Sequence, residues 1–384
     1  MEPTGGVILM VGEFPPSPGG IGEHAFHVAD GLRRLGVRVR VLCPSQHVTA
    51  QAATAFDARA PFPIVRYARE ASGPIGMLLQ RRRLRSWCLR QRPACLLASG
   101  ERATWMVAAV AHDLKLPWVV LGHGSEYLDA NTRRLERTRR CLMAAAAVIT
   151  NSHYTTNLVT RLGVPPEKVR LVTPGAVLAA LPEGQSPAAL RRRWGLEGKR
   201  VLLTVGRVSL RKAQDVTIRA MPAILKSVPD AIFLAVGIPA AKEQFERLAR
   251  ELGVGDRVIF AGVAAPEELP LYYHLCDLFV LNSRVTPTGE CEGFGIVLIE
   301  AGLAGRPVIG TRGCGAEDAI EHEVTGLLVR PDAPEEVARA AVRILSDPDL
   351  ARRMGENGRR RAVTLFNWDK LCRDIREILS PWLR

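Results

Sequence analysis

The sequence is poor in aromatic residues and lacks the cysteine and histidine spacings that bind zinc. Aromatic residues make up only 5% of the 384 positions, although the net charge is +13. Without zinc-finger spacing or aromatics interleaved among basic residues, this charge does not indicate a nucleic-acid-binding protein. None of the eight cysteines forms a CxxC pair, so we expect reduced thiols, no metal site and no nucleic-acid partner.

Long apolar runs are also missing. The longest, LMAAAAVI from Leu142 to Ile149, is far shorter than the roughly 20 residues that span a bilayer. The first run, Val7 to Val11, has the length of a strand and is too short for the core of a signal peptide. We therefore expect a cytoplasmic protein that does not cross a membrane.

Acidic residues are scarce in the first half of the chain. Residues 1–182 hold 23 Lys and Arg against 12 Asp and Glu, a net charge of +11, whereas residues 183–384 hold 29 against 27, a net charge of +2. Two dense basic runs lie in the first half, at 81–92 and 133–140. This one-sided charge suggests contact with something anionic, and peripheral association with the inner face of a membrane through Trp87 and its neighbouring arginines is one hypothesis. The alternative is an ordinary helix with a solvated basic face.

Short apolar runs alternate with helical patterns, twice. The expected strands of the first half are 7–11, 37–43, 94–98, 117–122, 147–150 and 169–173. After a linker at 174–187, the strands 200–206, 231–237, 257–262, 277–282 and 307–310 follow. Such alternation predicts an α/β fold with parallel sheets covered on both faces. We expect two doubly wound domains, 1–182 and 183–364. The last segment, 365–384, is expected to form a helix from about Trp368 to Leu379 that crosses back to the first domain.

Ligands of open parallel sheets bind beyond the carboxyl ends of the strands, and charged residues follow two strands of the second half. GRVSLRKAQD carries Arg207 and Lys212 between a strand and a helix expected to begin near Ala213. Two cations beside a helix N-terminus are suited to a diphosphate. The alternative is a solvated basic loop.

The stretch CEGFGIVLIE places Glu292 and Glu300 eight positions apart. Phe294, Gly295 and Ile296 are predicted to begin a helix, with their amides free, and Glu300 is expected about two turns inside it. One carboxylate is placed to bind sugar hydroxyls and the other a ribose diol. The alternative is a capping carboxylate and an unrelated glutamate on the helix surface.

Two loops of the first half complete the candidate site. Gly19, Gly20 and Gly22 of FPPSPGGIGEH are expected ahead of the first long helix, a weak signal for a phosphate loop, and His123 of HGSEY follows a strand. The glycine spacing is not GxGxxG with a distant acidic residue, which argues against NAD. A single histidine is more often structural, but its place at a strand end favours a function.

Together, GRVSLRKAQD, CEGFGIVLIE, PPSPGGIGEH and HGSEY resemble glycosyltransferase family 4, retaining enzymes of the GT-B fold with two Rossmann-like domains facing across a cleft. The glutamates match the family's E-x7-E motif. RKAQDVTIRAMP and the HG-E loop resemble most the bacterial α-mannosyltransferases that act on phosphatidylinositol mannosides. Ala213, where the family usually has glycine, VTPGAV at 172–177 and Cys314 depart from the family pattern.

The resemblance implies a role for each candidate. Arg207 and Lys212 would neutralise the leaving diphosphate of a GDP- or UDP-sugar, and Glu300 would hold the ribose. The sugar would be held by Glu292 and by the amides of Phe294, Gly295 and Ile296. Gly20 would let its loop close on the phosphate, and His123 would reach the sugar from the acceptor side. The remaining donor-binding glycines would be Gly19, Gly22, Gly206 and Gly293.

No metal or other cofactor is implied, because the cations serve the leaving group. The DPD at Asp347–Asp349, which matches the DxD of metal-dependent transferases, follows no expected strand and is interpreted as a helix cap. An anionic or membrane-associated glycolipid or polysaccharide is the expected acceptor. A soluble small-molecule acceptor and a GT-B nucleotide-sugar epimerase are the alternatives.

Overall fold

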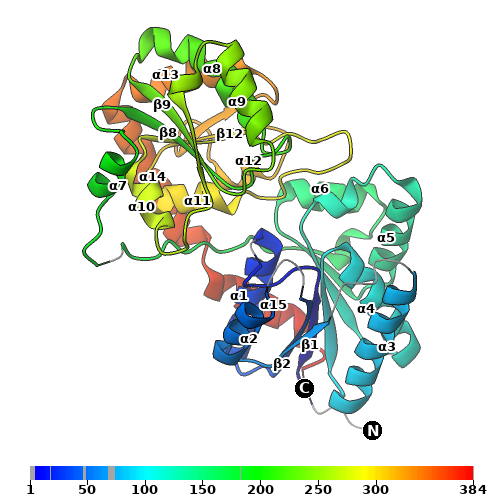
Figure 1. Cartoon of the computed structure of the whole chain (residues 1–384). Coiled ribbons are helices and arrows are strands. Elements are labelled where there is room, and N and C mark those ends of the chain that lie inside the picture. The colour runs from blue at the N-terminus through cyan, green and yellow to red at the C-terminus, as the bar shows by residue number, and fades with distance from the viewer. Residues whose placement is uncertain (1–4, 18, 46–48, 68–73, 182, 384) are drawn as a thin grey trace. The chain divides into compact units, whose positions relative to one another are not determined.

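A computed structural model describes residues 5–17, 19–45, 49–67, 74–181 and 183–383, without the side chain of Pro74. The chain forms two compact units (Figure 1), one made of Met1–Gly175 together with Trp368–Arg384 and the other of Ala176–Asn367. The first unit thus ends at Gly175, ahead of the expected boundary at residue 182, which lies outside the described residues. The C-terminal segment belongs to the first unit.

The first unit contains a seven-stranded sheet in the order β3-β2-β1-β4-β5-β6-β7, and all its strand pairs are parallel. The strands are β1 (Val7–Val11), β2 (Val39–Pro44), β3 (Ile64–Tyr67), β4 (Cys95–Ser99), β5 (Trp118–Gly122), β6 (Ala147–Thr150) and β7 (Val169–Leu171). The sequence did not predict β3, a half-buried edge strand of four residues. The order reverses between β1 and β4, so their carboxyl ends mark the place where ligands of such sheets bind.

Seven helices and two 3-10 turns accompany this sheet within the described residues. They are α1 (Gly20–Arg34), α2 (Ala50–Arg59), α3 (Pro74–Gln91), α4 (Glu101–Leu114), α5 (Thr132–Ala144), α6 (His153–Arg161) and α15 (Trp368–Leu379), with turns at Ser125–Tyr127 and Pro166–Lys168.

Helix α15 lies against α1 and is part of the core of the first unit. Trp368, Leu371, Ile375 and Leu379 are buried there, at the three- and four-residue spacing of one helix face. The helices approach so closely that a Cβ on Gly31 would lie 2.1 Å from the sulfur of Cys372. This contact brings the end of the chain back to its beginning.

The second unit contains a six-stranded parallel sheet in the order β10-β9-β8-β11-β12-β13. Its strands are β8 (Arg200–Val205), β9 (Ala231–Val236), β10 (Val258–Gly262), β11 (Leu278–Leu281), β12 (Val308–Thr311) and β13 (Gly326–Val329). Strand β13 was also missed by the sequence patterns, because it has four residues and begins with glycine. Here the order reverses between β8 and β11.

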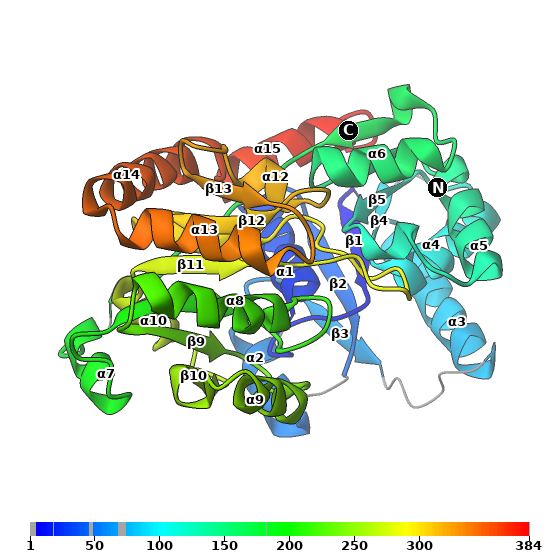
Figure 2. The same cartoon turned by 90° about the horizontal axis from the view of Figure 1, so that it is seen from above.

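Both faces of the second sheet are covered by helices, and alternate side chains of each strand enter different cores. Val201 and Leu203 of β8 belong to one core and Leu202 to the other. Helices α8 and α13 lie side by side over one face (Figure 2). The helices are α7 (Pro187–Arg193), α8 (Gln214–Ser227), α9 (Lys242–Glu251), α10 (Leu269–Leu275), α11 (Ile296–Leu303), α12 (Ala316–Ala319), α13 (Pro334–Leu345) and α14 (Pro348–Leu365), with a 3-10 turn at Gly255–Arg257.

Asp347 is the N-cap of α14, and its carboxylate accepts a hydrogen bond of 2.9 Å from the amide of Leu350. The interpretation of the DPD stretch as a helix cap is therefore confirmed. Within the described residues, no helix is long and apolar enough to span a membrane.

Candidate functional site

The loop between β8 and α8 is held in shape by Gln214, the first residue of α8. The side chain of Gln214 is buried, accepts a hydrogen bond from the amide of Ser209 and donates one to the carbonyl oxygen of Arg207. Just before it, Ala213 has a left-handed backbone with φ 52°. That conformation favours glycine, which is why the departure from the family's glycine at this position is notable. The loop thereby directs Lys212 toward the neighbouring strand β11.

Glu292, in the loop after β11, is the centre of a buried charged cluster. Its Oε2 accepts hydrogen bonds from Lys212 Nζ at 2.6 Å, Arg211 Nη1 at 3.2 Å and Ser283 Oγ at 3.1 Å. The cluster joins the carboxyl ends of β8 and β11, where the strand order reverses. Buried carboxylates need such partners, so the position of Glu292 in an apolar stretch is explained.

The protonation of this cluster follows from its neighbours. Burial by itself would raise the pKa of Glu292, but the charges of Lys212 and Arg211, with hydrogen bonds from Lys212 and Ser283, lower it to about 2. Burial lowers the pKa of Lys212, an effect that the charge of Glu292 opposes. The carboxylate is therefore ionised at neutral pH.

Arg207 does not join this cluster. Its side chain is exposed, and within the described part of the chain it makes no hydrogen bond or ion pair. The sequence argument paired Arg207 with Lys212, but the structure pairs Lys212 with Glu292 and adds Arg211 and Ser283. Arg211 adjoins Lys212 in sequence and Ser283 follows β11 by two residues; a search of strand-end loops for polar residues would have found both.

Helix α11 begins later than predicted. Its first residue is Ile296, whereas Phe294 and Gly295 precede it and Gly295 has φ 87°. Glu300 is therefore the fifth residue of the helix, little more than one turn inside it. The reason is the left-handed backbone at Gly295, which redirects the chain immediately before the helix.

The backbone at this helix start is tightly packed. The amide of Gly315 donates to the carbonyl oxygen of Glu292 at 2.9 Å, and a Cβ on Gly315 would lie 2.0 Å from the carbonyl oxygen of Gly293. Phe294 is buried against Phe366. Within the described residues, the amides of Phe294, Gly295 and Ile296 have no hydrogen-bond acceptor, so the α11 end of the charged cluster offers free donors.

In the first unit, the start of α1 is occupied by the chain's own carboxylate. Glu13 Oε1 accepts hydrogen bonds from the amides of Ile21 at 3.1 Å and Gly22 at 3.2 Å. Gly19 lies against this carboxylate, since a Cβ there would be 2.3 Å from Oε1. Gly20 and Gly22 lie within α1 rather than ahead of it. The amides expected to bind phosphate are therefore bound by Glu13, which immediately precedes the FPPSPGGIGEH stretch and which the motif analysis missed.

His123 follows β5 and belongs to a polar group at the same sheet edge. Its Nε2 lies 2.8 Å from Ser99 Oγ, and its amide donates to Glu126 Oε1 at 2.7 Å. The buried ring of His24 stands edge-on to it, with centroids 5.2 Å apart. Burial lowers the pKa of His123 to about 4, although the charge of Glu13 acts in the opposite direction, so the imidazole is neutral at pH 7.

The described residues contain no group of three or more His, Cys, Asp or Glu that could hold a metal ion. Cys314 is one of the departures from the family pattern. It is buried near Glu292, and burial raises the pKa of its thiol to about 12.

Comparison with known proteins places these features in a family. A family model described as Glycosyltransferase Family 4 matches residues 18–179, and one described as Glycosyl transferases group 1 matches residues 188–361. A GDP-mannose-dependent alpha-(1-6)-phosphatidylinositol monomannoside mannosyltransferase of Mycobacterium tuberculosis is 30% identical over 97% of both chains. An alpha-D-kanosaminyltransferase of Streptomyces kanamyceticus is 30% identical over 71% of this chain and 75% of its own.

A solved structure shows the same fold. Anabaena HepE in complex with UDP and glucose has a TM-score of 0.83 and 22% identity, with 98% of this chain and 99% of its own covered. The strand order reverses in both sheets, and the charged motif residues lie in the loops after β8 and β11. Both features agree with the sequence relationship to these glycosyltransferases. The chain therefore belongs to glycosyltransferase family 4, and it is a glycosyltransferase of the GT-B fold.

Proposed function

We propose that this glycosyltransferase, which uses a nucleotide-sugar donor, transfers the sugar with retention of its anomeric configuration to a hydroxyl of a membrane-associated glycolipid or polysaccharide. GDP-mannose is the favoured donor, in accord with the mycobacterial relative, and a UDP-sugar is the alternative. The observation that carries the proposal is the buried cluster of Lys212, Arg211 and Glu292 at the carboxyl ends of β8 and β11.

In the proposed reaction the diphosphate leaves with a growing negative charge. Lys212 supplies a fixed cation, and the exposed guanidinium of Arg207 supplies one that can move to the phosphate oxygens. Gly206 adjoins Lys212, since a Cβ there would lie in ordinary contact, 3.5 Å from Lys212 Cε. Groups already placed where charge develops stabilise the transition state more than the ground state.

The two glutamates take different parts of the donor. Glu292 and the free amides at the start of α11 are assigned to the sugar and its phosphate, and Glu300 is assigned to the ribose hydroxyls. Glu292 is polarised by three donors on one oxygen, which suits a residue that orients a substrate and stays ionised. Retention then follows from attack on the same face from which the diphosphate departs, with a phosphate oxygen accepting the acceptor proton.

His123 is assigned to the acceptor side, as a neutral hydrogen-bonding group oriented by Ser99. We propose no metal cofactor, because the cations already oppose the charge of the leaving group. Activity is therefore expected to persist when a chelator is added.

The proposal of a membrane acceptor is supported by the surface of α3. Ile75, Leu78 and Leu79 are 72%, 47% and 50% exposed, and they share one helix face at three- and four-residue spacing. Arg82 and Arg83 are exposed in the next turn. Apolar side chains beside cations are typical of helices that lie in a membrane interface. Trp87 is half-buried, so the apolar contact is assigned to Ile75, Leu78 and Leu79 instead.

A soluble acceptor is the second candidate. It is retained because one relative is named as an alpha-D-kanosaminyltransferase, a name that mentions no lipid. An epimerase would need no second substrate. Incubation with donor alone separates this last case: an epimerase forms a new sugar nucleotide, whereas a transferase gives only slow hydrolysis.

The first prediction tests the cluster. A panel of GDP- and UDP-sugars is screened for thermal stabilisation of the protein, and transfer is then measured with the donor that binds. At saturating donor, Lys212→Ala is expected to lower turnover by about 10²–10³ while weakening donor binding less. Lys226→Ala, which removes an exposed lysine in the last turn of α8, serves as control. Unchanged turnover in Lys212→Ala would refute the role.

A further inference from the structure

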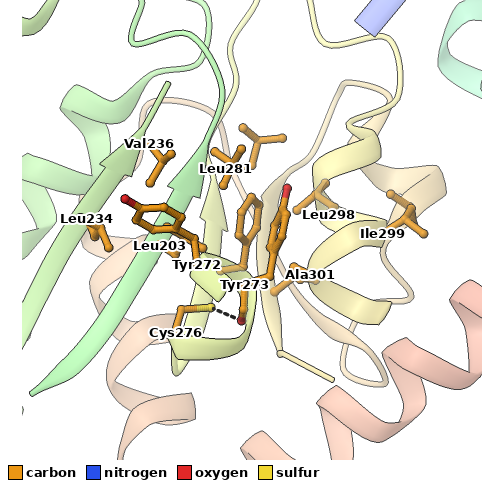
Figure 3. Packing of buried hydrophobic residues seen from close by; sticks show 14 of the residues in the cluster. Leu203, Leu234, Val236, Tyr272, Tyr273, Cys276, Leu281, Leu298, Ile299 and Ala301 are labelled. Carbon is orange, nitrogen blue, oxygen red and sulfur yellow. Dashed lines mark hydrogen bonds between the residues drawn. The ribbon is translucent and has the colours of Figure 1, made fainter. Parts of the chain in front are cut away.

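Helix α10 brings two adjacent tyrosines into the apolar core of the second unit, and their hydroxyls have different partners. Figure 3 shows Tyr272 and Tyr273 on α10, with Leu298 and Ala301 of α11 close to Tyr273. The Tyr272 hydroxyl accepts a hydrogen bond of 3.2 Å from Trp194 Nε1. The Tyr273 hydroxyl instead donates to Oε2 of Glu300 on α11.

Tyr273 is held rigidly. Its side chain is completely buried, its ring packs on Phe279 with centroids 5.7 Å apart, and its carbonyl oxygen accepts a hydrogen bond from Cys276 Sγ at 3.3 Å. Glu300, by contrast, is only half-buried, and a glutamate side chain has several rotatable bonds. The interaction therefore joins a fixed donor to the carboxylate of a flexible side chain.

We propose that Tyr273 is a positioning residue that fixes the Glu300 carboxylate for the ribose hydroxyls of the donor nucleotide. This inference rests on the function proposed above, which assigns Glu300 to the ribose. Holding a side chain in its bound conformation improves affinity because less freedom is lost when the ligand binds.

The electrostatics agree with a donating hydroxyl. Burial raises the pKa of Tyr273 well above its ordinary value, and the charge of Glu300 raises it further. The proton therefore stays on the phenol at neutral pH, and the hydroxyl remains a donor to the carboxylate.

Tyr272 provides a matched control. It is the preceding residue on the same short helix, is almost equally buried, and its hydroxyl also makes one side-chain hydrogen bond. Tyr272→Phe and Tyr273→Phe therefore remove the same atom from the same core. They differ in whether the lost partner is the indole of Trp194 or the carboxylate of Glu300.

The experiment measures calorimetric affinities for GDP and UDP and for their 2′-deoxy and 3′-deoxy counterparts. Wild type is expected to prefer the ribonucleotide. Tyr273→Phe is expected to weaken ribonucleotide binding about three- to tenfold, with little change for the deoxy compound that lacks the contacted hydroxyl. Tyr272→Phe should leave this preference as it is. In Tyr273→Phe/Glu300→Gln, the tyrosine change should add nothing to the effect of Glu300→Gln.

The outcomes separate this inference from the function on which it rests. Two outcomes would overturn the positioning role alone, provided that Glu300→Gln still removes the ribose preference. One is that Tyr273→Phe weakens ribonucleotide and deoxynucleotide binding equally. The other is that the two changes have additive effects in the double variant. A wild type without ribose preference, or one unchanged by Glu300→Gln, would overturn the assignment of Glu300 and the inference with it.

Discussion

Glu292 is a buried carboxylate whose charge is compensated by neighbouring hydrogen-bond donors. An isolated charge in this position would be costly, but three donors share one of its oxygens and two of them are cations. Removing one member of such a buried pair commonly costs more than the pair contributes, because the remaining charge is left uncompensated. The cluster is therefore a site where stability and function depend on the same residues.

The second prediction follows from the pKa of about 2 for Glu292. Because this folded-state pKa lies below the ordinary value of 4.5, the unfolded chain binds the extra proton between these values. The stabilisation is present above pH 4.5 and is lost as the pH falls toward 2. Glu292→Gln should be less stable than wild type by about 3 kcal/mol at neutral pH. Thermal melts should show this difference shrinking with acid.

The control for this prediction is Glu290→Gln, which changes an exposed glutamate of the same loop. It should leave the pH dependence of the melting temperature as in wild type. If Glu292→Gln and wild type differ by a constant amount from pH 7 to pH 3, the charged cluster is not the source of the stability.

At the scale of elements, the two basic runs of the first half have different environments. Much of the run on α5 has partners within the first unit: Arg139 and Arg140 pair with Glu136, and Arg137 lies over the ring of Trp105 at 4.4 Å. On α3, Arg81 pairs with Asp113. Four further arginines of α3 are exposed, namely Arg82, Arg83, Arg85 and Arg90, and Arg90 donates a hydrogen bond to Ser86 on the same helix.

The third prediction concerns α3. The protein is expected to bind anionic vesicles, to bind neutral vesicles weakly and to dissociate as salt is added, because each basic residue near an anionic surface contributes about 1 kcal/mol and is screened. Replacing Arg82, Arg83 and Arg85 with serine should greatly weaken vesicle binding in a flotation assay. Donor affinity should be unchanged.

Serine substitutions at three exposed arginines of α14, Arg353, Arg359 and Arg360, remove the same charge from the second unit and should not affect vesicle binding. A wild-type protein that ignores anionic vesicles at low salt would remove the main support for a lipid acceptor. The soluble acceptor would then be the better proposal.

At the scale of the whole molecule, the chain leaves the first unit at Gly175 and returns at Trp368. These two residues are in contact, since a Cβ on Gly175 would lie 2.4 Å from the amide nitrogen of Trp368. Trp368 also stacks on His27 with ring centroids 4.3 Å apart. The first unit is thus assembled from both ends of the chain and needs its last helix to cover α1.

The fourth prediction is that Ile375→Ala destabilises the first unit by about 2–5 kcal/mol, the cost of emptying a buried isoleucine site. Ile375 is fully buried in the core of that unit. Hydrogen exchange should show lost protection in β1 and α1 and unchanged protection in β8. Glu377→Ala, at an exposed position on the same helix, should change neither, and equal loss in both units would contradict the assignment of α15.

The sequence alone determined the features that depend on local patterns. Most strands were predicted within one or two residues, α15 was predicted at its observed bounds, and the cap at Asp347 was recognised, because apolar periodicity and capping act between near neighbours. Strands β3 and β13 were not predicted; both lie at the edge of their sheets, and their pairing depends on strands already in place.

Only the tertiary structure decided which polar groups meet. Lys212 and Glu292 are separated by 80 positions, and the sequence does not show that Arg211 and Ser283 would join them while Arg207 stays exposed. The same holds for Glu13 at the start of α1 and for Tyr273 beside Glu300. A side chain's partner is set by the order of strands in a sheet and by the direction of each loop, and these follow from long-range packing that no local pattern contains.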